Sequence, residues 1–201
     1  MPRPQTISDE EILDTARAVF LELGAQTSTA VVAKRLGISQ AVLFQRFGTK
    51  EQLLIEALKP REEPAFIGHL RQGPDDRPLP EQLLALAREF SSFLRELTPC
   101  VAVMRSAGID FAQVWKGKPE EAPPLRTQRL MADWLRKSQD AGQLSEEVDP
   151  ESAATVFLGS LQIRPFIAHV VGSELPVPEH DPYLEQLVSI LWQGMSPREE
   201  P

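Results

Sequence analysis

Apolar residues recur every three or four positions over most of this chain, which is the spacing of one face of an α-helix. The first such segment covers residues 8–24. Ser8 and Glu11 have the spacing of a capping box, in which each side chain bonds the backbone N–H of the other residue. Gly24 follows the last apolar residue, so the pattern predicts that the first helix ends there.

Three shorter helices are predicted next, at residues 28–36, 39–47 and 49–58. Between the first two, Gly37 can adopt the left-handed conformation that ends a helix, and Ser39 can cap the helix that follows. Two helices separated by so short a turn must cross at a steep angle. The segment therefore predicts a helix-turn-helix.

Beyond residue 59 the same pattern predicts longer helices separated by proline-marked loops. A new helix is expected to begin at Pro99, because proline lacks the N–H that the interior of a helix needs. The helices expected in this part cover residues 80–97, 99–115, 125–141, 150–171 and 182–192, while residues 64–71 either extend the helix before them or begin a new one. The chain is therefore predicted to be all-α, with about nine helices.

Charge is distributed unevenly along the sequence. The chain has 21 Lys and Arg and 29 Asp and Glu, which give a formal charge of -8. Residues 28–50 nevertheless contain four cations (Lys34, Arg35, Arg46 and Lys50) and no acidic residue. An acidic protein that excludes acids from one window is a candidate for placing that window against phosphate.

The overall composition is that of an ordinary folded protein, with 42% apolar and 25% charged residues. Cys100 is the only cysteine, so an intramolecular disulfide is impossible, which fits a reducing compartment. No apolar run approaches the ~20 residues of a membrane span, and the first residues lack the apolar segment of a signal peptide. A soluble, cytoplasmic protein is expected, with no membrane partner.

One combination of residues spans several of the predicted helices. It consists of Thr27, Ser28 and Thr29, Val32-Ala33, Leu36-Gly37-Ile38-Ser39, Leu43-Phe44-Gln45-Arg46-Phe47, Lys50 and Leu53-Leu54. This combination resembles the DNA-binding domain of the TetR family of bacterial transcriptional regulators. Phe44 stands where that family usually has a Tyr whose hydroxyl contacts a phosphate. The resemblance implies a helix-turn-helix domain over residues 1–58 and a helical effector-binding and dimerisation domain over residues 59–201.

The resemblance makes residues 39–47 the recognition helix. A Gln in such a helix can bind adenine through two hydrogen bonds, and a small apolar side chain can pack on a thymine methyl. Thr29, Arg46 and Lys50 are assigned to phosphate. The residues expected to contact DNA are Thr29, Ser39, Gln40, Ala41, Val42, Phe44, Gln45, Arg46 and Lys50.

The resemblance further implies a sequence-specific transcriptional regulator, most simply a homodimeric repressor released from a palindromic double-stranded operator by a small effector. An apolar effector is expected, because pockets of this kind are mostly apolar. The expected effector pocket is lined by Phe93, Met104, Phe111, Trp134 and Phe157. The expected dimer interface contains Leu184, Leu187, Val188 and Leu191.

Other chemistry finds little support in the sequence. The three histidines have no metal-ligand spacing, and no nucleophile motif, phosphate loop or dinucleotide fingerprint is present. No metal, cofactor or enzymatic activity is therefore expected. Two alternatives stay open: a helical partner-binding protein of the same fold without DNA affinity, and an enzyme that uses a pocket in the second domain.

Overall fold

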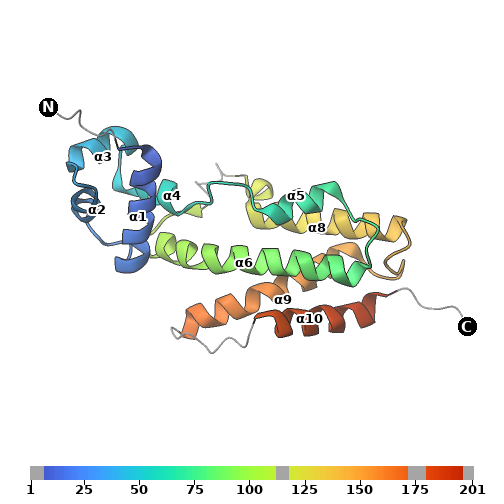
Figure 1. Cartoon of the computed structure of the whole chain (residues 1–201). Helices are drawn as coiled ribbons and strands as arrows, with labels where there is room; N and C mark the ends of the chain where they lie inside the picture. Colours follow the sequence, from blue (N-terminus) through green and yellow to red (C-terminus); the bar gives the residue numbers. More distant parts are fainter. Residues whose placement is uncertain (1–6, 112–117, 172–179, 197–201) are drawn as a thin grey trace, which may run out of the picture. The chain divides into compact units, whose positions relative to one another are not determined.

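The computed structural model describes residues 7–111, 118–171 and 180–196 (Figure 1). These residues form nine α-helices and a short 3-10 helix, with no strand among them, so the predicted all-α class is confirmed. The predicted helix end near Trp115 lies outside the described residues. None of the helices in the described ranges is both long and apolar enough to span a bilayer.

The first of two compact units combines Met1–Arg61 with Leu97–Phe111. Its helices are α1 (Asp9–Leu23), α2 (Thr29–Leu36), α3 (Gln40–Phe47), α4 (Lys50–Leu58) and the C-terminal part of α6 (Leu79–Ser106). Side chains from all of these helices form one core, which includes Ile12, Phe20, Val32, Leu43, Leu54, Cys100 and Met104. The sequence division at residue 58 had assigned residues 97–111 to the second domain.

Local capping determines where the helices of this unit begin. Ser8 accepts a hydrogen bond from the Glu11 N–H at 3.1 Å, and the Ser8 N–H donates to the Glu11 carboxylate at 2.8 Å, so the predicted capping box is confirmed. The backbone N–H of Ser8, and then its hydroxyl, hold the pKa of Glu11 below its ordinary value. This contribution to stability is therefore complete above the unfolded pKa of Glu11 and is lost as the pH falls through the lowered folded pKa.

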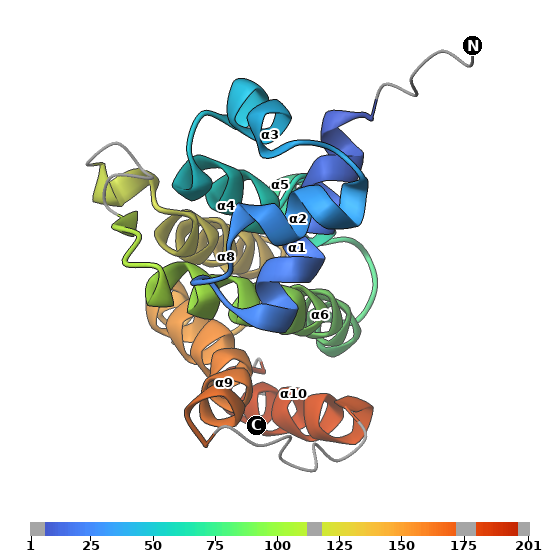
Figure 2. The same ribbon diagram turned by 90° about the vertical axis from the view of Figure 1, so that its left-hand side faces the viewer.

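The second unit contains Glu62–Glu96 and Ala112–Pro201. Its helices are α5 (Ala65–Gln72), the N-terminal part of α6, η1 (Pro119–Glu121), α8 (Pro123–Asp140), α9 (Pro150–Val171) and α10 (His180–Met195). Figures 1 and 2 both show α10 beside α9, and the Tyr183 hydroxyl of α10 donates to the Ser160 carbonyl of α9 at 3.0 Å. Helix α10 is longer at both ends than the helix predicted at residues 182–192.

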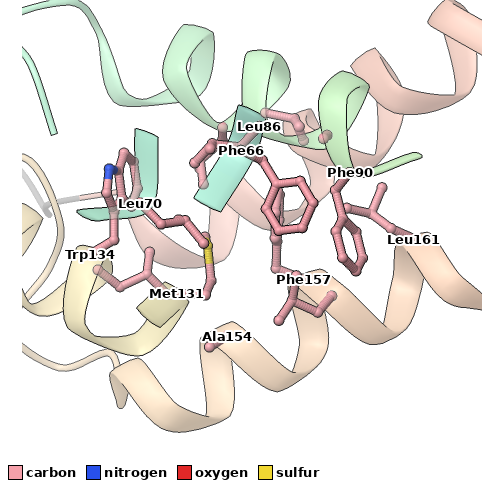
Figure 3. Packing of buried hydrophobic residues seen from close by; sticks show 14 of the residues in the cluster. Phe66, Leu70, Leu86, Phe90, Met131, Trp134, Ala154, Phe157 and Leu161 are labelled. Atoms are coloured by element: carbon pink, nitrogen blue, oxygen red, sulfur yellow. The ribbon is translucent and has the colours of Figure 1, made fainter. Parts of the chain in front are cut away.

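Aromatic and aliphatic side chains from five helices form the core of the second unit. In Figure 3, Phe66 of α5 and Phe90 of α6 lie on one side of this core, with Phe157 and Leu161 of α9 beside them. The rings of Phe66 and Phe90 meet edge to face, with centroids 5.1 Å apart. This arrangement is the favourable one for two aromatic quadrupoles and adds about 0.5–1.5 kcal/mol to the burial of the rings.

The predicted restart of the chain at Pro99 is wrong, because α6 runs without interruption from Leu79 to Ser106. Leu94, before the proline, is buried in the core of the second unit, and Met104, after it, is buried in the core of the first. Burying such a side chain stabilises the fold by about 1.5–3 kcal/mol. Two of them together offset the cost of about 3 kcal/mol of a proline inside a helix.

The cost of Pro99 leads to a prediction. Pro99→Ala should raise the free energy of unfolding by about 1–3 kcal/mol, because alanine restores the missing N–H and removes the clash with the preceding turn. Pro80→Ala is the matched control, since Pro80 lies in the first turn of the same helix, where no intrahelical N–H bond is lost. Urea denaturation followed by circular dichroism measures both. Equal effects of the two substitutions would contradict this account of α6.

Candidate nucleic-acid interface

The turn between α2 and α3 has the geometry that the sequence predicted. Gly37 adopts the left-handed conformation, with φ of 68° and ψ of 26°. The Ile38 N–H donates to the Ala33 carbonyl at 3.0 Å and the Gly37 N–H to the Lys34 carbonyl at 3.3 Å, which together form a Schellman motif. Residues 37–39 alone therefore connect the two helices, and Figure 2 shows α3 following α2 across this turn.

Helix α3 is held in the first unit by one fully buried side chain, Leu43, which is 1% exposed. Gln40, Ala41, Phe44, Gln45 and Arg46 are the exposed residues of this helix. Val42 and Phe47 are half-buried. A short helix anchored along one edge and open along the other can enter the major groove of a DNA duplex.

Ser39 occupies the N-cap position of α3, as predicted, but its side chain makes no capping hydrogen bond. Its backbone is extended, with φ of -84° and ψ of 152°, and its side chain is exposed. By contrast, the hydroxyl of Ser28 caps α2 by accepting from the Ala30 N–H at 3.2 Å. The Ser39 hydroxyl, together with the N–H groups of Gln40 and Ala41, is therefore available to a partner, whereas the Val42 N–H donates to the Ser39 carbonyl at 3.1 Å.

Thr29 and Gln40, both predicted to contact DNA, contact each other. The side-chain amide of Gln40 donates to Thr29 Oγ1 at 2.8 Å. Thr29 itself is only 4% exposed, so its side chain has little surface to offer to a phosphate. The bond joins the start of α2 to the start of α3 and fixes the direction in which Gln40 leaves the helix.

Arg46, also predicted to contact phosphate, points back toward α1. Its Nη1 donates to the Ile7 carbonyl and forms an ion pair with the Asp9 carboxylate at 3.2 Å. The other arginines of residues 7–61 are engaged in the same way. Arg17 donates to the Ala57 and Leu58 carbonyls, Arg35 pairs with Glu22, and Arg61 pairs with Asp14.

Two cations of residues 7–61 make no hydrogen bond or ion pair in the described structure, namely Lys34 and Lys50. Lys34 is exposed near the end of α2, and Lys50 is half-buried in the first turn of α4. Lys50 was among the predicted DNA contacts and Lys34 was not. The signal for Lys34 in the sequence was its position within residues 28–50, which contain no acidic residue.

Gly48 joins the end of α3 to the start of α4. Its φ of 74° is unfavourable for any residue with a side chain. A Cβ built at this position would lie 2.3 Å from Gln52 Oε1. That oxygen accepts from the Thr49 N–H at 3.1 Å within the predicted capping box of α4, which is confirmed.

The five residues predicted to line an effector pocket belong to two different cores. Trp134 and Phe157 are buried in the core of the second unit, and Phe93 packs against it. Met104 is buried in the core of the first unit, and Phe111 packs there, with the Arg105 guanidinium 5.1 Å from its ring centroid. The structure thus brings together three of the five.

The residues predicted to form the dimer interface lie in or against the core of their own unit. Leu184 is 0% and Val188 4% exposed, while Leu187 and Leu191 are partly buried. Sequence reasoning missed a set of exposed apolar side chains on α9: Val156, Ile163, Phe166, Ile167, Val170 and Val171. The signal was that this helix is apolar on all sides, so a single core cannot cover it.

Within the described residues, no group of three or more His, Cys, Asp or Glu side chains is placed to hold a metal ion. His69 forms a hydrogen-bonded pair with Glu89 at 2.9 Å on the surface of the second unit. The geometry is that of a helix-turn-helix surface.

Comparison with known families agrees with this geometry. Residues 12–57 match the family described as bacterial regulatory proteins of the tetR family, and residues 81–190 match the C-terminal domain of AefR-like transcriptional repressors. The second match alone covers more than half of the chain. The chain therefore belongs to the TetR family of bacterial transcriptional regulators.

Solved structures share the fold over nearly the full length. A TetR family regulator from Pseudomonas syringae pv. tomato is 23% identical, with a TM-score of 0.64 over 94% of this chain and 99% of that one. A SmeT–triclosan complex is 22% identical (TM-score 0.64; 96% and 98% covered). A cysteine mutant of the regulator CifR with operator DNA is 21% identical (TM-score 0.62; 93% and 98% covered). No curated protein sequence matches the chain.

Proposed function

We propose that this protein is a homodimeric repressor that binds a palindromic operator and leaves it when a small, mainly apolar effector binds. The observation that carries the proposal is the α2–turn–α3 geometry with an exposed α3 face, found in a chain that belongs to a family of transcriptional regulators. The related CifR structure contains double-stranded operator DNA. Helix α3 would occupy the major groove of each half-site, with the half-sites about 34–36 Å apart.

In this arrangement Lys34 and Lys50 are the residues of the first unit that contact phosphates. Neither is engaged with an acidic group, whereas the arginines around them are. Lys50 also lies in the first turn of α4, where backbone N–H groups and the helix dipole favour an anion. Each phosphate neutralised by a lysine releases counterions, so binding weakens as salt is added.

Lys50→Ala should weaken binding to all duplexes by a similar factor and reduce the slope of log K against log salt by about 0.9 per subunit. Lys59→Ala is the matched control, since Lys59 belongs to the same unit and pairs with Glu56. Fluorescence anisotropy at several salt concentrations measures both. If the wild-type protein shows no salt-dependent binding to any duplex, the alternative of a partner-binding protein without DNA affinity is favoured.

The proposed homodimer uses the exposed face of α9. Its apolar residues have heptad-like spacing at Val156, Ile163, Phe166 and Val170, opposite the face formed by buried residues such as Phe157 and Leu161. Gly159 lies on the exposed face, and a Cβ there would meet no atom of this chain. A second α9 can therefore approach closely. With α10 beside it, each subunit would contribute two helices to a four-helix bundle.

Phe166→Glu should convert the dimer into monomers without loss of helicity. Phe166 is 59% exposed in the single chain, and a two-fold interface meets each substitution twice. A buried unpaired charge costs about 3–5 kcal/mol, so the dissociation constant should rise by about two to four orders of magnitude. Leu125→Glu, on α8, is the control, because Leu125 is also exposed but lies outside the α9 face. Sedimentation velocity measures the oligomeric state of each variant, and a monomeric wild-type protein would refute the proposed interface.

The proposed effector site lies in the core of the second unit, near Phe93, Trp134 and Phe157. The described residues of this unit bury four polar side chains: Gln82, Ser91, Thr127 and Ser138. Gln82 holds the loop before α6 through the Asp75 and Arg77 carbonyls, and Ser138 donates to the Trp134 carbonyl. So few polar side chains among so many buried apolar ones favour a mainly apolar effector. The related SmeT structure contains triclosan.

Effector and operator would act through a population shift. An effector that favours one conformation of the dimer lowers operator affinity only as far as it binds the two conformations differently. The coupling is reciprocal, so the operator must lower effector affinity by the same factor. Neither step requires a bond to be made or broken.

Trp134→Phe should weaken effector binding about tenfold, because a smaller ring leaves part of the contact unfilled, while operator affinity without effector stays near wild type. The probe is a panel of apolar aromatic compounds that includes triclosan, tested for release of a labelled operator. Trp192→Phe is the control, as Trp192 packs against the same core from α10. Equal losses in both variants, or a panel in which no compound releases DNA, would count against this site.

A further inference from the structure

The exposed face of α3 carries amide and apolar groups but no available charge. Gln40, Ala41, Phe44 and Gln45 are exposed, and the single cation of the helix, Arg46, is bonded to the Ile7 carbonyl and the Asp9 carboxylate. The sequence from residue 28 to residue 50 contains no Asp or Glu. Any base pair that α3 meets in a major groove must therefore be recognised by amides, hydroxyls and apolar contacts.

Each base edge in the major groove prefers a different side chain. Guanine is bound by Arg or Lys, cytosine by Asp or Glu, adenine by Asn or Gln, and the thymine methyl by apolar groups. The open face of α3 offers the last two kinds and neither of the first two. We infer that α3 recognises A·T base pairs, with a glutamine amide on adenine and Phe44 against a thymine methyl. This inference rests on the proposed DNA binding and specifies its target.

Gln40 is prepared for this role before DNA arrives. Its amide donates one N–H to Thr29 Oγ1 at 2.8 Å, which leaves Oε1 and the second N–H free to bond a base. Adenine presents one acceptor, N7, and one donor, the N6 amino group, so the remaining pair of groups matches it. Thr29 is thus a positioning residue that acts through Gln40, and not a phosphate contact.

Phe44 supplies the apolar half of the recognition. Its side chain is 42% exposed although aromatic, and no hydroxyl is present to bond a phosphate. An exposed ring one turn beyond Gln40 is placed to cover the methyl group that distinguishes thymine from uracil and cytosine. Burying one methyl group corresponds to about a fourfold gain in affinity.

The test begins with selection of bound duplexes from a random pool by the full-length protein. Each thymine of the selected site is then replaced in turn by deoxyuridine, which removes only the methyl group. We expect A·T-rich core positions in each half-site and at least one thymine whose replacement lowers wild-type affinity about fourfold. Phe44→Ala should abolish the effect of that replacement, and Lys50→Ala, the control, should retain it.

The outcomes separate the inference from the function on which it rests. If the selected core is made of G·C pairs, or if no thymine responds to replacement by deoxyuridine, the inference is overturned while the proposed DNA binding stands. If no duplex is enriched, both are overturned. Thr29→Val retains the side-chain shape without the acceptor, and it should reduce the preference for adenine at one position by about fivefold or more without changing the salt slope.

Discussion

Helix α6 constrains both units of this protein, because this one helix contributes buried side chains to the hydrophobic core of each unit. Leu83, Ala87 and Leu94 belong to the core of the second unit, and Cys100 and Met104 belong to the core of the first. The structure requires both sets to be buried, and it buries them from one unbroken helix. This requirement outweighs the proline in its interior, and it means that neither core is complete without residues from the same helix.

Features fixed by neighbouring residues were predictable from the sequence. The capping boxes at Ser8 and Thr49, the left-handed Gly37 and the amphipathic helices all follow from residues a few positions apart. The all-α class and the helix-turn-helix follow from these. The continuity of α6 was not predictable in this way, because it depends on which core buries Leu94 and which buries Met104. The core in which each of these residues is buried is determined by the tertiary structure.

In the candidate site, too, some features follow from neighbouring residues in the sequence and others do not. The exposed face of α3 could be predicted from helical periodicity, since Leu43 alone needs to be buried. The contacts of Thr29 with Gln40 and of Arg46 with Ile7 join residues 11 and 39 positions apart, and no local pattern indicates them. A cation on a predicted surface helix can face a ligand or its own protein, and only the geometry decides. Here the arginines of residues 7–61 bond groups of their own unit, and Lys34 and Lys50 are the cations that we propose for the phosphates.

The clash that a side chain at Gly48 would meet has a consequence for redesign. Gly48 ends α3, and the Gln52 oxygen that a Cβ there would meet belongs to the capping box that begins α4, so a substitution of Gly48 would disturb the start of the next helix. Gly37 sets a similar limit at the other end. The side chains between these two glycines that bond no other part of the unit, such as Ala41, Phe44 and Gln45, can therefore be exchanged for those of another family member while Leu43, both boundaries and the bonds of Gln40 and Arg46 are kept. A regulator of this family can in this way be given a different DNA sequence to recognise without a change to either core.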